Sequence, residues 1–334
     1  RAALGVAREQ HDVLLPLARD ARVIVGAALQ FAGPAIAERL GIPYVYVMFS
    51  PVFLRSAELS TMGAPRGAVG RALNRVRLAI EDARQLRHAG WLLSLRKQWN
   101  QPPIRNLERY LTRSGTILLA SDPVLAPPPR DDAGVVQTGH LYLDVPADLP
   151  VEVEEFLADG PPPIFIGFGS MRHRKATRFA DALLEGLRLV GRRAIVHEAV
   201  MRLSSASRPT GDMLVTSDLP HAPLFPRLAA CVHHGGYGTT IEAARAGTPQ
   251  VIIPHLGDQF HHGKRVAELG IGRDPIPLEK VTAARFARAL EFALSPATAA
   301  AARDFGVGLR SREGTARAAD EIERILVEAA GSHR

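Results

Sequence analysis

The sequence has little of several features that would narrow its function at once. It holds one cysteine, Cys231, in 334 residues, which excludes a disulfide scaffold and fits a reducing compartment. It has no apolar run of about 18 residues, so we expect no transmembrane helix. The opening residues lack the charged-then-apolar order of a signal peptide. We therefore expect a cytoplasmic protein.

Two sequence patterns for phosphate and metal binding are also missing. There is no Gly-x-Gly-x-x-Gly turn followed by an acid, which argues against a dinucleotide oxidoreductase. There is no Asp-x-Asp triplet, the usual carboxylate pair for a divalent cation on a diphosphate. His261 and His262 are adjacent, and adjacent residues on a helix do not face one centre. We predict no metal site and no bound cofactor.

The charge of the sequence is basic, with a formal net charge of +7. Most of the excess is arginine scattered through predicted helices, and aromatic residues make up only 6% of the chain. This distribution indicates a solvated arginine-rich surface first and a phosphate-bearing small molecule second. We expect no nucleic-acid partner. A contact with a membrane surface is allowed by the charge but not required by it.

The length and the order of elements indicate two α/β domains. Strand-like runs at 22–29 and 44–49 flank a helix at 34–41, which is typical of a parallel sheet. Residues 66–99 read as a long helical stretch, and proline-rich segments between 121 and 162 then interrupt the alternation.

The second half resumes the alternation of strands and helices, so a chain of this length fits two domains. Strands are predicted at 163–170, 193–197, 213–217, 230–234 and 250–254. The predicted domains are 1–150 and 151–310, followed by a helix at 311–334 that is free to pack back on the first domain.

Polar residues and glycines follow two predicted strands of the second domain, at the point where each strand ends. Ligands of open α/β sheets lie beyond these carboxyl ends, where glycines allow close backbone approach and a helix N-terminus offers N–H groups to an anion. Glycine turns of purely steric origin are the alternative, and for the histidine a buried hydrogen bond. The predicted phosphate-binding residues are Ser170, His234, Gly235, Gly236, Gly238 and Thr239.

Three further polar residues suit the hydroxyl groups of a sugar. Glu242 falls one turn into the helix after the glycines, where a carboxylate can contact a diol or simply favour the helix dipole. Asp258 and Gln259 follow the strand at 250–254 and offer acceptors and an amide donor. The alternative for Asp258 is a capping role at the start of a helix from 258 to 269.

These segments together resemble the donor-binding signature of UDP-glycosyltransferase-type enzymes with the GT-B fold. The resemblance rests on the run from "LPHAPLFPRLAACVHHGGYGTT" through "HLGDQFHHGKRVAELGIG", and bacterial natural-product and sterol glycosyltransferases are the most similar in pattern. "AERLGIPYVYVMFSP", "LAPPPRDDAGVVQTGHLYLD" and "PIFIGFGSM" match other recurrent segments in the same order. The resemblance implies an α/β architecture of two Rossmann-like domains with parallel sheets that face a cleft.

The resemblance also implies roles for the polar residues. Ser170 and His234, with the amides after His234, would bind the diphosphate of a nucleotide sugar. Glu242 would hold the ribose diol, which favours UDP over dTDP, and Asp258 with Gln259 would hold the transferred hexose. The implied reaction is inverting, metal-independent transfer to a hydroxyl group of a hydrophobic acceptor, such as a natural product or a sterol.

The catalytic base of this family, a histidine or aspartate, lies in a glycine-rich loop after the first strand. The chain opens at Arg1 in what resembles a later helix, so we expect the first βαβ unit, and the base with it, to be missing from the first domain. His11 and His88 follow no such strand, and neither is assigned as the base.

The acceptor site is expected in the first domain. Trp91 and Leu95 share a predicted helix face that would line an apolar pocket or, alternatively, pack against the N-terminal sheet. Two other functions stay open: a nucleotide-sugar epimerase of the same fold, and a non-catalytic subunit that binds a nucleotide sugar.

Overall fold

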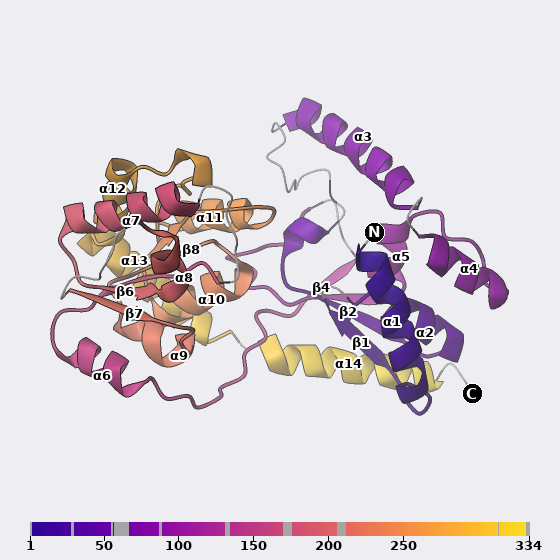
Figure 1. The fold of residues 1–334 in the computed structure, drawn as a ribbon. Helices are drawn as coiled ribbons and strands as arrows, with labels where there is room; N and C mark the ends of the chain where they lie inside the picture. The colour runs from indigo at the N-terminus through magenta and orange to yellow at the C-terminus, as the bar shows by residue number, and fades with distance from the viewer. Residues whose placement is uncertain are drawn as a thin grey trace. The chain divides into compact units, whose positions relative to one another are not determined.

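The chain folds into two compact units, each built on a parallel β-sheet (Figure 1). The first unit holds residues 1–142 and 313–334, and the second holds residues 143–312. The computed structural model describes residues 2–27, 30–54, 56, 67–86, 89–130, 134–169, 176–205, 212–312 and 314–331. No helix in these ranges is both long and apolar enough to cross a bilayer.

The sheet of the first unit has four strands in the order β1-β2-β3-β4. They are β1 (Ile24–Ala27), β2 (Tyr44–Met48), β3 (Thr116–Leu119) and β4 (Val135–Gln137). The C-terminal helix α14 (Gly314–Gly331) packs on this sheet, where its Ala318 and Ile325 join Val45 and Leu118 in one buried cluster. The helix therefore belongs to the first unit although it follows the whole second unit in sequence.

Helices of the first unit cover this sheet and one another. They are α1 (Ala2–Leu17), α2 (Gly33–Leu40), the short η1 (Pro51–Phe53), α3 (Gly67–Leu86), α4 (Gly90–Gln98) and α5 (Leu107–Arg113). Helix α4 contacts α1, and α3 contacts α5. The helical stretch expected at 66–99 is therefore two helices with different neighbours.

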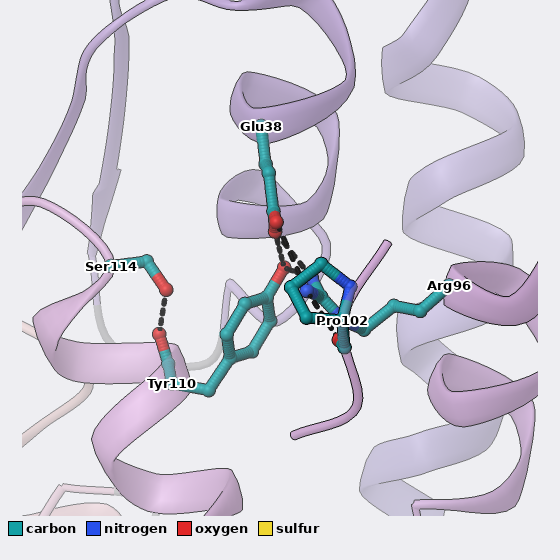
Figure 2. Close-up of polar contacts among 5 residues, drawn as sticks. All are labelled: Glu38, Arg96, Pro102, Tyr110 and Ser114. Atoms are coloured by element: carbon teal, nitrogen blue, oxygen red, sulfur yellow. Dashed lines mark hydrogen bonds and ion pairs between the residues drawn. The ribbon is translucent and has the colours of Figure 1, made fainter. Parts of the chain in front are cut away.

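A buried arginine joins three of these helices (Figure 2). Arg96 of α4 makes a two-pronged ion pair with Glu38 of α2, with 3.0 Å from Nη2 to Oε1. Tyr110 of α5 donates its hydroxyl to Glu38 Oε2 at 2.9 Å, and the Arg96 guanidinium lies 4.7 Å from its ring centre. The guanidinium also donates to the Pro102 carbonyl, so the charge is hydrogen-bonded on several sides.

Removal of this arginine is expected to weaken the first unit strongly. Arg96→Met removes the hydrogen bonds of a buried guanidinium, and because the Glu38 carboxylate that it leaves is itself exposed, the cost should be about 2 kcal/mol of unfolding free energy. Urea titration of the full chain measures this cost. The matched control is Arg324→Met on α14, whose ion pairs with Glu321 and Glu328 are exposed and should contribute less than about 1 kcal/mol. Equal losses in both variants would contradict the prediction.

Acid should remove the stability that the ion pair between Arg96 and Glu38 contributes. Burial alone raises the pKa of the Glu38 carboxyl, but the hydrogen bonds from Arg96 and Tyr110 outweigh it and hold that pKa below its ordinary value. A lowered pKa stabilises the folded state at neutral pH, and this contribution is lost as the pH falls through the folded-state pKa. Glu38→Gln is therefore expected to show a weaker loss of stability in acid than the unchanged chain.

The sheet of the second unit has five parallel strands in the order β7-β6-β5-β8-β9. They are β5 (Ile164–Ile166), β6 (Ala194–His197), β7 (Met213–Thr216), β8 (Ala230–His233) and β9 (Gln250–Ile252). Its helices are α6 (Val151–Ala158), α7 (Ala176–Val190), α8 (Glu198–Leu203), α9 (His221–Leu224), α10 (Tyr237–Ala246), α11 (Gln259–Glu268), α12 (Ala283–Ala293) and α13 (Pro296–Arg310), with η2 (Phe225–Arg227) and η3 (Leu278–Lys280). Strands β5 and β8 are neighbours, so the two predicted phosphate-binding loops leave the sheet side by side.

Candidate functional site

The loop between β8 and α10 has a backbone that only glycine accommodates at one position. Gly235 has a φ of +88°, in the left-handed region that L side chains rarely adopt. A Cβ atom at this position would lie 2.7 Å from Ile252 Cγ2 and 3.0 Å from the carbonyl oxygen of Gln259. The loop is therefore pressed against β9 and α11, and any larger residue would push it out of place.

A fully buried histidine, His233, supports the backbone of this loop. His233 Nδ1 accepts a hydrogen bond from the Gly235 N–H at 3.1 Å, so the ring proton lies on Nε2, 2.9 Å from Gln250 Oε1. Burial, reinforced by the neighbouring His234, lowers the pKa of His233 to about 3. The ring is therefore neutral at neutral pH and serves as a support for the backbone.

A second buried histidine reaches the loop from α11. His262 Nδ1 lies 2.9 Å from the Gly235 carbonyl oxygen, which can only accept, so the ring donates. The same nitrogen is 3.9 Å from Asp258 Oδ2. His262 has no solvent exposure, and it links the "HHGGYGTT" segment to the "GDQFHH" segment. The two segments of the sequence motif are thus joined by a buried hydrogen bond.

His234 is the histidine of this loop that is available to a ligand. Its ring is half-buried, and a Cβ at Gly236 would come within 2.5 Å of its Nε2. Its Nδ1 is buried and has no hydrogen-bond partner among the described residues. Burial lowers the pKa of His234 more than nearby Asp258 raises it, so the ring is neutral and offers one N–H donor. A neutral imidazole that is partly exposed can donate this N–H to a bound group.

The N-terminus of α10 lies directly after His234. Gly236 occupies the cap position, and as a glycine it makes no side-chain hydrogen bond to the first turn. Gly238 is exposed and Thr239 is half-buried in this turn. The Thr240 hydroxyl donates to the Gly236 carbonyl at 2.8 Å and stays within the fold. A helix N-terminus beside an imidazole is suited to an anion.

The loop after β5 approaches the same histidine. Gly169 has a φ of +57°, and a Cβ there would lie 3.9 Å from His234 Cε1. Ser170, the predicted hydroxyl donor of this loop, lies outside the described residues. The described end of the loop is therefore next to the anion site, as expected for adjacent strands.

Asp258 and Gln259 begin α11 with different roles. Asp258 occupies the cap position, but its side chain makes no capping hydrogen bond. Gln259 is buried, and its Oε1 accepts from the backbone N–H groups of His255 and Leu256 at 2.7 and 3.1 Å. Gln259 thus shapes the turn before the helix, while the Asp258 carboxylate stays near His262 and His234.

Glu242 lies on the second turn of α10, half-buried and close to His221. Burial lowers the pKa of His221, and the negative charge of Glu242 opposes the shift. The His221 ring stacks on Phe225 with centroids 4.3 Å apart. The predicted ribose-binding carboxylate therefore faces α9, one turn beyond the anion site.

The structure places the predicted acceptor residues in a packed region of the first unit. Trp91 and Trp99 both contact His11, with ring centroids 5.6 and 5.4 Å from it. Leu95 is half-buried on the same helix. Packing therefore accounts for Trp91, with helix α1 as the neighbour in place of the sheet. His88 lies outside the described residues.

Metal-binding side chains do not gather in the described part of the chain. No group of three or more histidine, cysteine, aspartate or glutamate side chains there has an arrangement able to hold a metal ion. The site consists instead of backbone N–H groups, a neutral imidazole and carboxylates.

Known proteins are similar to this chain in sequence and in fold. The family described as Erythromycin biosynthesis protein CIII-like, C-terminal domain, matches residues 182–328. The vancomycin aglycone glucosyltransferase of Amycolatopsis orientalis is 34% identical over 334 residues, covering 96% of this chain and 77% of that protein. A sterol 3-beta-glucosyltransferase of Arabidopsis thaliana is 32% identical over 197 residues, covering 58% of this chain and 31% of that protein. The solved structure of glycosyltransferase VinC in complex with dTDP is similar with a TM-score of 0.67 at 22% identity, covering 98% of this chain and 79% of VinC.

Proposed function

The chain belongs to the EryCIII-like family of GT-B glycosyltransferases, and we propose that it transfers a hexose from a nucleotide diphosphate sugar to a hydroxyl group of a lipophilic acceptor. In this reaction the bond from the anomeric carbon to the diphosphate breaks as the bond to the acceptor oxygen forms on the opposite face. The acceptor proton passes to a base, and the nucleotide diphosphate leaves as an anion.

The observation that carries this proposal is the arrangement around His234. Its partly exposed ring, the N-terminus of α10 and the Asp258 carboxylate belong to one connected group of loops. The imidazole and the backbone N–H groups would receive the diphosphate, whose negative charge increases during bond breaking. Asp258 would accept hydrogen bonds from the hydroxyl groups of the hexose.

The nucleotide is proposed to be UDP because of Glu242. A carboxylate accepts two hydrogen bonds from the ribose diol, and the deoxyribose of dTDP offers one fewer hydroxyl. The dTDP bound to VinC makes dTDP-sugars the second choice. Equilibrium binding of UDP and dTDP to the full chain compares the two directly.

Incubation with a nucleotide sugar and lipophilic alcohols tests the activity itself. UDP-glucose or dTDP-glucose, offered with a panel of sterols and aromatic polyketide aglycones, is expected to give a glycoside. Its anomeric configuration, read by NMR, should be inverted relative to the donor. Appearance of an epimerised nucleotide sugar would instead indicate an epimerase. Tight nucleotide-sugar binding with neither product would indicate a binding subunit.

Removal of divalent cations is expected to leave the reaction rate nearly unchanged. In the proposed reaction His234 and the backbone N–H groups of α10 stabilise the departing diphosphate, so no cation is needed for that task. Initial rates with a chelator and with added magnesium measure this. A strict requirement for magnesium would overturn this part of the proposal.

A further inference from the structure

Helix α3 carries an apolar stripe on its exposed surface. Val69, Leu73, Val76 and Ile80 are 70%, 54%, 60% and 64% exposed. Their spacing of four, three and four residues places them on one face of the helix. Large apolar side chains so exposed in a continuous row are uncommon on a protein surface and usually mark a contact with another molecule.

The opposite side of α3 attaches the helix to the first unit. Gly70 and Asn74 are buried, Leu78 is half-buried, and α3 contacts α5. At 100° per residue these three positions lie on the side of the helix away from the apolar stripe. One face of the helix thus carries its buried positions, while the other is exposed.

Arginines border the apolar stripe on both sides. At 100° per residue, Arg77 and Arg84 follow one edge of the stripe. Arg75 lies beyond the other edge, which exposed alanines widen, whereas Arg71 lies on the side of the helix away from the stripe. The apolar face then spans about 140° of the helix. Apolar side chains flanked by long cationic ones are typical of a helix that lies in the plane of a membrane surface.

The charge pattern disfavours pairing of α3 with a second copy of itself. In a two-stranded coiled coil the stripe would form the seam, with Arg77 and Arg84 beside it on one side and Ala72 and Ala79 on the other. A second copy would thus bring arginine against arginine or alanine, with no acidic partner. The arginines are attracted to an anionic surface, and the net charge of +7 strengthens this attraction.

We propose that α3 docks this chain on an anionic lipid surface, with the apolar stripe among the acyl chains and the arginines at the phosphate groups. The helix lies on the membrane and does not span it, since only one of its faces is apolar. The inference rests on α3 alone and does not depend on the donor site.

Vesicle co-sedimentation of the full chain tests the proposal. The chain is expected to bind vesicles of phosphatidylcholine mixed with phosphatidylglycerol, and not to bind vesicles of pure phosphatidylcholine. Val76→Asp with Ile80→Asp should lower binding at least about tenfold. Arg75→Gln with Arg84→Gln should weaken it about fivefold per arginine, an effect that added salt removes.

Matched substitutions elsewhere control for general effects. Val307→Asp with Val327→Asp changes two valines that are 63% and 72% exposed on α13 and α14, and it should leave binding unchanged. Arg285→Gln with Arg288→Gln removes two exposed arginines of α12 and should also leave vesicle binding unchanged. Absence of binding to anionic vesicles, or equal binding by the α3 and control variants, would overturn the proposal. Dimerisation that Val76→Asp abolishes, without vesicle binding, would assign the stripe to a second copy instead.

Discussion

His234→Ala is expected to lower the turnover number for sugar transfer by about 10²- to 10³-fold, the usual loss when one donor to a developing oxyanion is removed. The imidazole is neutral because burial lowers its pKa, and its Nδ1 has no partner among the described residues. Because no described residue hydrogen-bonds this Nδ1, removing the ring should do little damage to the fold. Initial rates and thermal unfolding of the variant measure the two effects separately.

A conservative variant separates hydrogen bonding from shape. His234→Gln restores an amide N–H at similar reach, so it should recover part of the lost rate, whereas His234→Ala should also weaken the binding of UDP itself. Both variants should melt close to the unchanged chain because the loop is supported by His233 and His262. Unchanged turnover in His234→Ala would remove this residue from the donor site.

The parallel sheets and most of their strands could be predicted because their signal is local. Most strands of the second unit are continuous apolar runs that end in glycine or a polar residue. Strand β4 was missed, since its three residues lie within proline-rich sequence. Helix α13 was missed because "PATAAAARDFGVGLR" has no wide apolar stripe.

The start of α13 did carry a readable signal. Ser295 accepts a hydrogen bond from the Thr298 N–H, and Pro296 is the first helical residue, which together form a typical helix start. The glycine that lowered its helical signal has a packing reason. A Cβ at Gly306 would lie 2.8 Å from the Ala244 carbonyl oxygen, so the glycine lets α13 approach α10 closely.

The candidate site could be predicted only as far as its residues are close in sequence. The glycines and His234 follow one strand, and their type alone indicates an anion site. The supporting contacts could not be predicted, because His233 pairs with Gln250 through the register of β8 and β9, and His262 reaches Gly235 across 27 residues. Sequence spacing does not show which of several histidines turns inward, and here His233 and His262 do while His234 keeps a partly exposed ring.

Asp258→Ala is expected to lower kcat/KM for the nucleotide sugar by about 10²- to 10³-fold while the affinity for UDP alone stays nearly unchanged. The carboxylate would accept hydrogen bonds from two sugar hydroxyls, and a hydrogen bond to a charged group contributes about 1.5–3 kcal/mol. The diphosphate would be held by His234 and the start of α10, which the substitution does not touch. Calorimetric titration measures the affinity for UDP, and initial rates with UDP-glucose measure kcat/KM, so the two effects can be compared.

The alternative role of Asp258, in the stability of α11, predicts a different result. Its side chain makes no capping hydrogen bond, and its distance of 3.9 Å from His262 Nδ1 is too long for a strong one, so the substitution should cost less than about 1 kcal/mol of unfolding free energy. Asp304→Ala, at an exposed position of α13, is the matched control and should change neither rate nor stability. If Asp258→Ala lost stability and UDP affinity together, the carboxylate would be a support of the loop that His262 holds. Retained UDP affinity with lost transfer would place it at the sugar.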